Sequence, residues 1–316
     1  MRFFLTFLVL LLLLSGLGGA WWGREAVRAP GPLAAPIQIV VPRGGASTIG
    51  AMLAERGVVA DARLFAAAAW ITRKEGHLRA AEFAVPARSS ILEVLEILRH
   101  ARPVQRRLTI PEGLAVRQLL PILDHAEGLV GDIPSFAEGS LLPETYTYEW
   151  GDSRASIVAR ADAAMDAALA EAWAARAPNL PLASPREALV LASIVERETG
   201  QADERARVAG VFINRLRRGM ALQSDPTVAY AAAAGPLDRQ ISRADLDRDH
   251  PFNTYRIRGL PPGPIASPGR EALRAVTQPE ANDFLYFVAD GQGGHVFART
   301  LEEHNRNVAR WRALGQ

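Results

Sequence analysis

A run of about 20 uncharged residues opens the chain and constrains its fold more than any other feature. Residues 3–22 read FFLTFLVLLLLLSGLGGAWW and follow Arg2. At a rise of 1.5 Å per residue, such a run matches the ~30 Å hydrocarbon thickness of a bilayer, and tryptophan rings at its end favour the interface. We therefore expect residues 1–22 to be a transmembrane anchor that leaves the rest of the chain outside the cytoplasm.

A cleavable signal peptide is the alternative interpretation of the same residues. Gly18, Gly19 and Ala20 are small enough for a signal peptidase, and the apolar core Phe3–Leu14 has a suitable length. Both interpretations export residues 24–316, so the compartment in which these residues act is the same.

The composition excludes several classes of protein. The chain has 316 residues, 49% of them hydrophobic, and a net charge of +2, so it is too apolar for a disordered protein and long enough for two domains. The absence of cysteine excludes disulfides and thiolate chemistry. The six histidines are scattered, and neither a phosphate loop nor a Rossmann glycine pattern occurs, so we expect no metal and no cofactor.

The positive charge does not indicate nucleic acid binding. Lys74 is the only lysine, and the arginines are spread along the chain between acidic residues. We interpret them as a solvated surface and expect no nucleic acid partner.

The chain after the anchor predicts an α+β fold. Residues 23–36 are rich in proline, glycine and alanine and are predicted to be a linker, followed by a small domain at 37–104 and a larger one at 105–316. Three short apolar strands at 37–41, 83–85 and 108–110 are each followed by a proline turn and an amphipathic helix, which favours a repeated strand–helix unit.

The larger domain begins with an alanine-rich helical stretch and ends with a hairpin. Residues 155–188 have the helical pattern. Near the end, 283–289 and 295–299 resemble two strands joined by the loop GQGG. Thr300 and Glu303 then fit a capping box that opens a final helix.

The best candidate for chemistry is the segment SPREALVLASIVERETG at 184–200. Ser184 and Glu187 suit a capping box, and every residue from Ala188 to Val195 is apolar or small, so the helix between them is predicted to be buried on all sides. Glu196 follows directly, and the small residues before it would leave room for a ligand. A carboxyl at the edge of an apolar core has a raised pKa, which suits a general acid.

Two other interpretations concern the carboxyls of this helix. Glu196 could instead end a core helix and pair with an arginine such as Arg197 or Arg205. Glu198 lies about 200° further around the helix, so we expect it to face elsewhere.

Three further segments combine polar groups with stiff loops, which suits sugar hydroxyls and N-acetyl groups but is also typical of structural loops. The candidate contacts in these segments are Gln223, Ser224, Asp225, Thr227, Asn253, Tyr255 and Glu138.

Four ordered blocks of the chain resemble the YceG-like (MltG-type) endolytic murein transglycosylases. They are LASIVERETG at 191–200, LQSDPTVAYA at 222–231, FNTYRIRGLPPGPIASPG at 252–269 and LYFVADGQGGHVFARTLEEHN at 285–305. The resemblance implies that Glu196 is the catalytic acid and base, that the first small domain is LysM-like and contacts glycan, and that residues 105–316 form the catalytic domain. It also implies an inner-membrane location with a periplasmic catalytic domain, and peptidoglycan synthases as partners.

The activity implied by this resemblance is cleavage of the β-1,4 bond between N-acetylmuramic acid and N-acetylglucosamine in peptidoglycan strands, with a 1,6-anhydro end as product. Such cleavage would terminate nascent strands. Two alternatives stay open: a glycan-binding scaffold without turnover, and an ordinary hydrolase with Asp225 or Glu144 as its second carboxyl.

Overall fold

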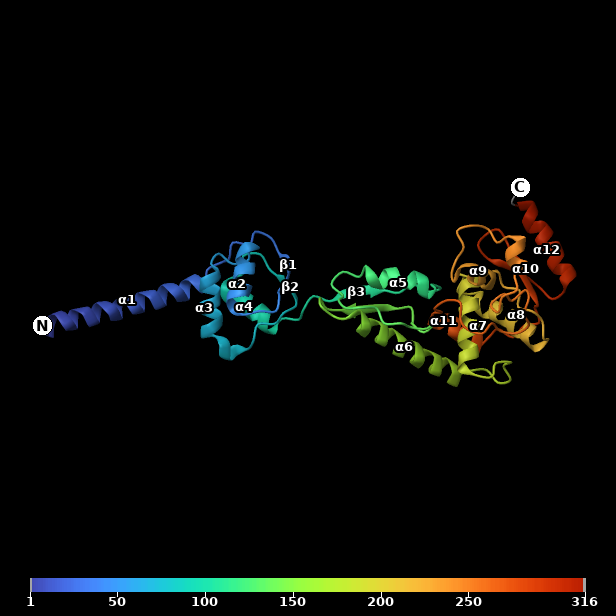
Figure 1. Ribbon diagram of the computed structural model, residues 1–316, viewed down its shortest axis with the longest axis horizontal. Coiled ribbons are helices and arrows are strands. Elements are labelled where there is room, and N and C mark those ends of the chain that lie inside the picture. Colours follow the sequence, from blue (N-terminus) through green and yellow to red (C-terminus); the bar gives the residue numbers. More distant parts are fainter. Residues whose placement is uncertain (1, 315–316) are drawn as a thin grey trace. The chain divides into compact units, whose positions relative to one another are not determined.

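The structure is a computed structural model that describes residues 2–314, and it divides into two compact units. Unit 1 comprises the residues up to 106 together with 148–152, and unit 2 comprises 107–147 and the residues from 153 onward. Helices and short antiparallel strand pairs occur in both units, which confirms the predicted α+β class (Figure 1).

Helix α1 (Arg2–Arg28) opens unit 1 and packs against α3 and α4. It extends past Trp22, so the first residues of the predicted linker 23–36 are helical. Among the side chains that the structure describes, no helix combines the length and the apolar character needed to cross a bilayer. The predicted anchor is therefore not confirmed and stays a prediction.

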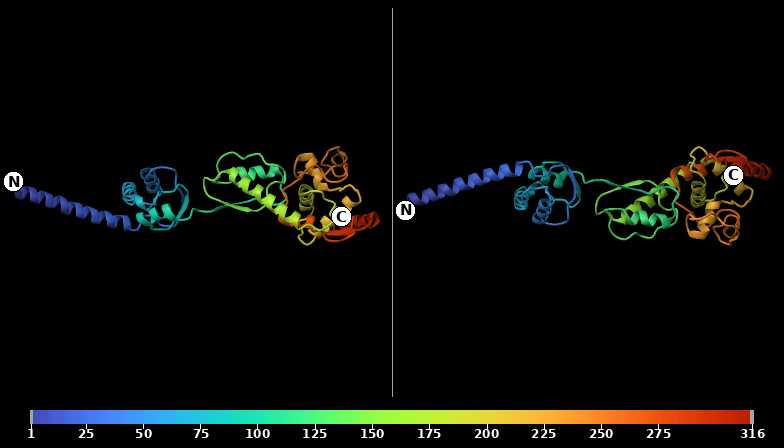
Figure 2. Two further views of the ribbon diagram at one scale, coloured as in Figure 1. Left: turned by 90° about the horizontal axis from the view of Figure 1, so that it is seen from below. Right: turned by 90° about the horizontal axis from the view of Figure 1, so that it is seen from above.

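The rest of unit 1 combines one strand pair with helices that pack on one another, and α4 packs against β2. Figure 2 shows these helices beyond the end of α1. Its elements are β1 (Ile37–Val40), α2 (Ala46–Glu55), α3 (Ala62–Ile71), a 3₁₀ turn (Arg73–Glu75), β2 (Glu82–Val85) and α4 (Ile91–His100). The sequence pattern predicts all of these except α3 and the 3₁₀ turn. Strands β1 and β2 are antiparallel, with Ile37 opposite Val85.

Local sequence determines where the helices of unit 1 begin. Asp61 accepts hydrogen bonds from two backbone amides at the start of α3, and Ser90 and Glu93 form a capping box at the start of α4. The helices then bury Phe65 and Leu95 against Phe83 of the strand pair, so unit 1 has a hydrophobic core of its own.

Unit 2 is mainly helical. Its elements are β3 (Arg106–Thr109, whose first residue belongs to unit 1), α5 (Val116–Asp124), β4 (Thr145–Tyr148, whose last residue belongs to unit 1), α6 (Arg154–Ala174), α7 (Pro185–Glu198), α8 (Arg205–Arg217), α9 (Asp225–Ala233), α10 (Arg243–Asp247), α11 (Arg270–Thr277), β5 (Tyr286–Ala289), β6 (His295–Ala298) and α12 (Leu301–Leu314). The alanine-rich stretch 155–188 is therefore two helices with a loop between them, because α6 ends at Ala174.

The three strand–proline–helix segments do not form a repeated sheet. Strand β1 pairs with β2, whereas β3 pairs with β4, and β4 is not the strand of a strand–proline–helix segment. The recurring pattern is therefore local turn chemistry rather than three equivalent units.

Helix α7 lies at the centre of the hydrophobic core of unit 2. Its residues from Ala188 to Val195 are all buried, as the sequence predicts, and it packs against α6, α8 and α11. Met165, Phe212 and Leu273 come from those three neighbours and belong to the same cluster. A helix enclosed in this way holds its last turn in a fixed position.

The predicted hairpin and final helix are confirmed. Strands β5 and β6 are antiparallel, with Tyr286 opposite Ala298, and α12 packs against both of them. Glu303 donates its backbone N–H to Thr300 Oγ1 at 3.2 Å and accepts from the Thr300 amide, as a capping box requires. This hairpin fixes the position of α12, whose residues line one pocket together with the end of α7.

Candidate functional site

The carboxyl-terminal end of α7 carries both candidate carboxyls. At the other end, Ser184 Oγ accepts from the Glu187 amide at 3.3 Å, while Glu187 bonds the amide of Ala183 at 2.7 Å. Ser193, which the sequence suggests as a place for a ligand, is instead fully buried and accepts a 3.0 Å hydrogen bond from the Ile265 amide. The space before Glu196 is thus filled by protein.

Glu196 connects α7 to the start of α11. Its Oε2 accepts from the Gly269 amide at 2.9 Å, its Oε1 lies 3.5 Å from Arg205 Nη2, and its side chain is 5% exposed. Burial raises the pKa of Glu196, the Gly269 hydrogen bond opposes this, and the nearby charge of Glu112 raises it further. These contacts match the alternative in which Glu196 pairs with an arginine at the end of a core helix.

Glu198 faces a pocket of about 640 Å³ whose lining does not include Glu196. Ser224 Oγ donates a short hydrogen bond to Glu198 Oε1. Burial raises the pKa of Glu198 to about 7, a shift that Asp225 increases and that Ser224 and Arg215 oppose. The protein therefore keeps this carboxyl poised between its protonated and ionised forms near neutral pH.

Several side chains that the sequence singles out gather at Glu198. Gln223, Asp225 and Tyr255 line the same pocket, and Tyr255 Oη donates to Asp225 Oδ1 at 2.7 Å. Burial and the hydrogen bond to Asp225 raise the pKa of Tyr255, so its phenol stays protonated as a donor. The site thus contains the half-buried carboxyl of Glu198, the exposed carboxyl of Asp225, and two polar side chains.

Arg215 forms the floor of this arrangement. Its guanidinium is buried, donates to the Leu285 and Leu222 carbonyls at 2.6 and 2.9 Å, and donates to Gln223 Oε1 at 3.1 Å. Burial lowers the pKa of Arg215 from its ordinary value, but the guanidinium remains a cation. It fixes the Gln223 side chain and supplies positive charge near Glu198.

Gln223 has a backbone conformation that is uncommon for a residue with a side chain. Its φ is +52°, in the left-handed region, and its amide donates to the Thr254 carbonyl at 3.1 Å. Strain of this kind persists where the surroundings over-determine it, and it is found disproportionately at functional sites.

Three other predicted contacts do not line the pocket. Thr227 is fully buried and bonds Thr254 Oγ1 at 2.8 Å, and Asn253 is fully buried with its amide directed at backbone carbonyls such as that of Arg248 at 2.8 Å. Glu138 accepts from the Val116 amide at 2.9 Å and from Tyr230 Oη at 3.1 Å, and burial raises its pKa. Thr227 and Asn253 thus support the loops that carry Ser224 and Tyr255, whereas Glu138 joins the start of α5 to Tyr230 on α9.

The sequence favours Glu196 as the acid and predicts that Glu198 faces elsewhere; the two carboxyls do lie in different surroundings, and Glu198 is the one that lines the pocket. The structure brings Gln223, Ser224, Asp225 and Tyr255 to Glu198 and leaves Glu196 and Glu138 elsewhere. Glu144, considered as a second carboxyl, pairs with Arg270 at 2.8 Å instead. Within residues 2–314, no three acidic or histidine side chains are grouped so that they could hold a metal ion.

Comparison with known proteins identifies similar chains. The YceG-like family model matches residues 39–310. An endolytic murein transglycosylase of Bacillus subtilis (strain 168) is 37% identical over 54% of this chain and 46% of its own length. One of Streptococcus pneumoniae (strain D39) is 30% identical over 97% of this chain and 64% of its own length. The chain thus spans about half to two thirds of the length of these relatives.

One solved structure is similar as well. The crystal structure of a YceG-like protein from Listeria monocytogenes superimposes with a TM-score of 0.55 at 28% sequence identity. The match covers 86% of this chain and 98% of that one.

The raised pKa of Glu198 predicts a specific dependence of stability on pH. An unfolded glutamate titrates near 4.5, so between there and about 7 the folded chain holds a proton that the unfolded chain has released. Stability therefore falls as pH rises through this window, by on the order of 3 kcal/mol at most. Glu198→Gln removes this titration, so urea unfolding should show the variant gaining stability relative to wild type from pH 5 to pH 8.

The control is Glu171→Gln on α6, where the side chain is 82% exposed. That variant should follow the wild-type pH dependence. A constant difference between wild type and Glu198→Gln across this pH range would contradict the raised pKa.

Proposed function

Because the chain belongs to the YceG-like family, whose model matches residues 39–310, we propose that it is a peptidoglycan lytic transglycosylase. Its relatives are named endolytic murein transglycosylases. The observation that carries the proposal for this chain is Glu198, a half-buried carboxyl with a pKa of about 7 that faces a polar pocket. Cleavage of a glycosidic bond needs a proton donor of this kind.

We propose Glu198, and not the sequence-predicted Glu196, as the proton donor. Both carboxyls are desolvated, but Glu196 is bonded to the α11 amide and lies against Arg205, which favours its ionised form. Glu198 instead receives one hydroxyl hydrogen bond from Ser224 and faces the pocket. A proton that must reach a substrate oxygen is better supplied from Glu198.

The proposed reaction uses this one carboxyl twice. Protonated Glu198 gives its proton to the bridging oxygen as the bond from that oxygen to C1 of N-acetylmuramic acid breaks. The resulting carboxylate then takes the proton from the 6-hydroxyl of the same sugar, and that oxygen bonds to C1. The product is a 1,6-anhydro end, and the intramolecular nucleophile supplies positioning that an external water lacks.

The other pocket residues would hold the strand during these steps. Gln223 and Tyr255 present a side-chain amide and a phenol to the pocket, where sugar hydroxyls and N-acetyl groups need partners. Thr227 and Asn253 would act indirectly, by fixing the backbone that carries these groups, and Glu138 by holding Tyr230 on α9. In the cell, cleavage of this type would terminate nascent glycan strands beside peptidoglycan synthases.

A water-using hydrolase is the second candidate, because Asp225 lines the same pocket as Glu198. An inverting or retaining glycosidase needs a second carboxyl as base or nucleophile. Two observations favour the lyase, because they give Asp225 a role other than that of base or nucleophile. Asp225 accepts the Tyr255 hydrogen bond, and its charge helps to keep Glu198 protonated.

The two carboxyls of α7 provide a matched pair of variants. Glu198→Gln keeps the shape and removes the proton, so release of fragments from purified glycan strands should fall on the order of 100-fold or more. Glu196→Gln keeps an oxygen for the Gly269 amide, so its activity should stay within a few-fold of wild type. A larger loss of activity in Glu196→Gln than in Glu198→Gln would identify Glu196 as the proton donor. Near-wild-type activity of both variants would overturn the proposed mechanism.

The products separate the lyase from its alternatives. Mass spectrometry of digested strands should find new ends that lack one water relative to reducing ends. A reducing end whose formation is lost in Asp225→Asn would favour the hydrolase. Strands that bind and stay intact would indicate a glycan-binding scaffold.

We also propose the predicted cellular arrangement, in which residues 3–22 attach the chain to the inner membrane and a LysM-like segment at 37–104 contacts glycan in the periplasm. The support is the absence of charge from residues 3–22. The full chain should sediment with membranes and resist extraction by alkali, whereas a chain without residues 3–22 should not. Equal recovery of both in the soluble fraction would contradict the anchor.

A further inference from the structure

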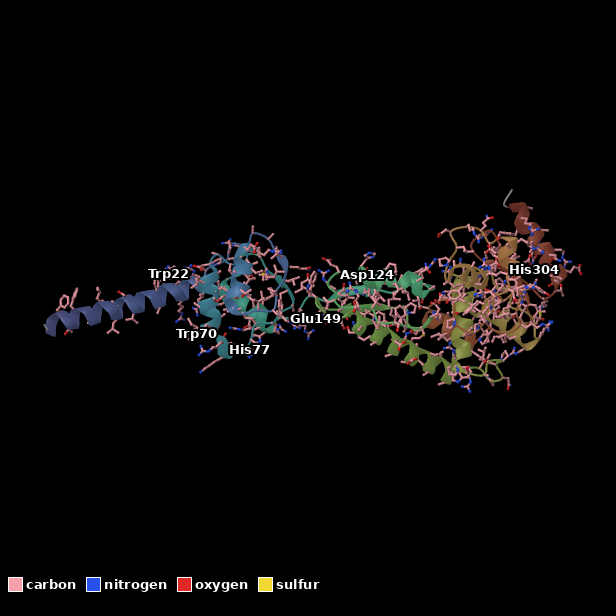
Figure 3. The ribbon with its side chains drawn as sticks, viewed as in Figure 1. Trp22, Trp70, His77, Asp124, Glu149 and His304 are labelled. Carbon is pink, nitrogen blue, oxygen red and sulfur yellow. The ribbon has the colours of Figure 1, made fainter. Side chains whose placement is uncertain are left out.

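The far wall of the pocket at Glu198 is built by the last helix, α12. His304, Val308 and Trp311 of this helix line the pocket. They lie four and three residues apart, so they share one face of the helix. Figure 3 labels His304 on α12. The mechanism derived above uses none of these side chains.

Trp311 has the features of a platform for a sugar ring. Trp311 is 44% exposed although it lines a pocket, whereas Phe212 of the same unit is buried in the core. The flat face of a pyranose carries C–H groups and is apolar, and an indole offers a large rigid surface with little rotational entropy to lose. A partly exposed indole within a polar pocket is thus suited to sugar more than to a charged or wholly apolar ligand.

His304 adds an unsatisfied polar atom to the same wall. Its ring stacks on Tyr286 at 5.2 Å between ring centres, and the guanidinium carbon of Arg215 lies 5.1 Å from that tyrosine ring. The Nδ1 atom of His304 is buried and has no hydrogen-bond partner among the described residues. Because the pocket does not reach this atom, a hydroxyl or N-acetyl group of a ligand would bond the half-buried ring through its other nitrogen, Nε2.

Arg215 connects this wall to the proposed acid. It bonds Gln223, which lines the pocket next to Ser224, and it also contacts the ring on which His304 stacks. The α12 face and Glu198 therefore belong to one continuous pocket, whose volume of about 640 Å³ is in the range that holds a whole small ligand.

We propose that α12 forms a sugar-binding subsite for the glycan strand, in which Trp311 stacks on a sugar ring and His304 hydrogen-bonds to a polar group of the strand. The inference rests on the proposed function for its ligand, since the occupant is the same polymer whose bond lies at Glu198. It adds residues that hold the strand and leaves the identity of the proton donor unchanged.

The test measures binding separately from turnover. Fluorescently labelled, uncross-linked glycan strands are titrated into the full chain carrying Glu198→Gln, with and without Trp311→Ala. Removal of the indole should raise Kd about tenfold or more, as expected for a central aromatic contact. Trp311→Phe keeps a ring and should restore most of the affinity.

His304→Phe gives an independent measurement. It preserves a ring for Tyr286 and removes both ring nitrogens, so Kd should rise several-fold while the chain stays folded. Thermal unfolding checks that the variant is folded. Arg306→Ala is the matched control on α12: it lies outside the pocket lining and pairs with Glu302 at 2.5 Å, so its Kd should be unchanged. Unchanged Kd in both Trp311→Ala and His304→Phe would overturn the subsite.

Activity with otherwise wild-type chains distinguishes this inference from the proposed function. Trp311→Ala should raise KM more than it lowers kcat. If Glu198→Gln remains active while Trp311→Ala still weakens binding, the assigned acid is wrong and the subsite stands. If the strands bind neither parent nor variants, both the substrate class and the subsite are overturned.

Discussion

Desolvation of Glu198 is the physical constraint on which the candidate site depends. The carboxyl follows a helical run, Ala188 to Val195, in which every residue is buried, so the position of the last turn is fixed while Glu198 faces the pocket. The resulting pKa of about 7 has an energetic cost above neutral pH, which the large core around α7 offsets. The packing of unit 2 thus offsets the free-energy cost of ionising Glu198 at this desolvated position.

The loops around this carboxyl are held by hydrogen bonds that end on backbone atoms. Thr254 accepts from the Ser224 amide at 2.9 Å, Asn253 bonds three carbonyls around α10, and Arg215 bonds the Leu285 and Leu222 carbonyls. Because each of these side chains fixes main chain, the groups that face the pocket are positioned in part by residues outside its lining, such as Thr254 and Asn253. This explains why one conspicuous polar motif contains both pocket residues and purely supporting ones.

The sequence predicts much of the fold but does not separate the residues that line the pocket from those that lie outside it. Caps at Ser90, Ser184 and Thr300 and apolar periodicity locate most helices, because those signals are local. Glu196 and Glu198 cannot be distinguished in this way, since a helix with no polar face offers no direction for comparison. Only long-range packing, which brings α11 to one carboxyl and Ser224 to the other, separates their environments. Likewise, the polar character of Thr227 and Asn253 gives no sign that both are fully buried.

The left-handed backbone at Gln223 has a consequence for laboratory evolution. Glycine adopts this conformation without steric cost, so a screen for heat resistance alone would tend to enrich Gln223→Gly. That exchange would also delete the amide oxygen that receives Arg215. Thermostable variants selected without an activity assay would therefore accumulate Gln223→Gly and lose this pocket side chain. Its enrichment in such a library would indicate that the native glutamine lowers stability in exchange for the geometry of the pocket.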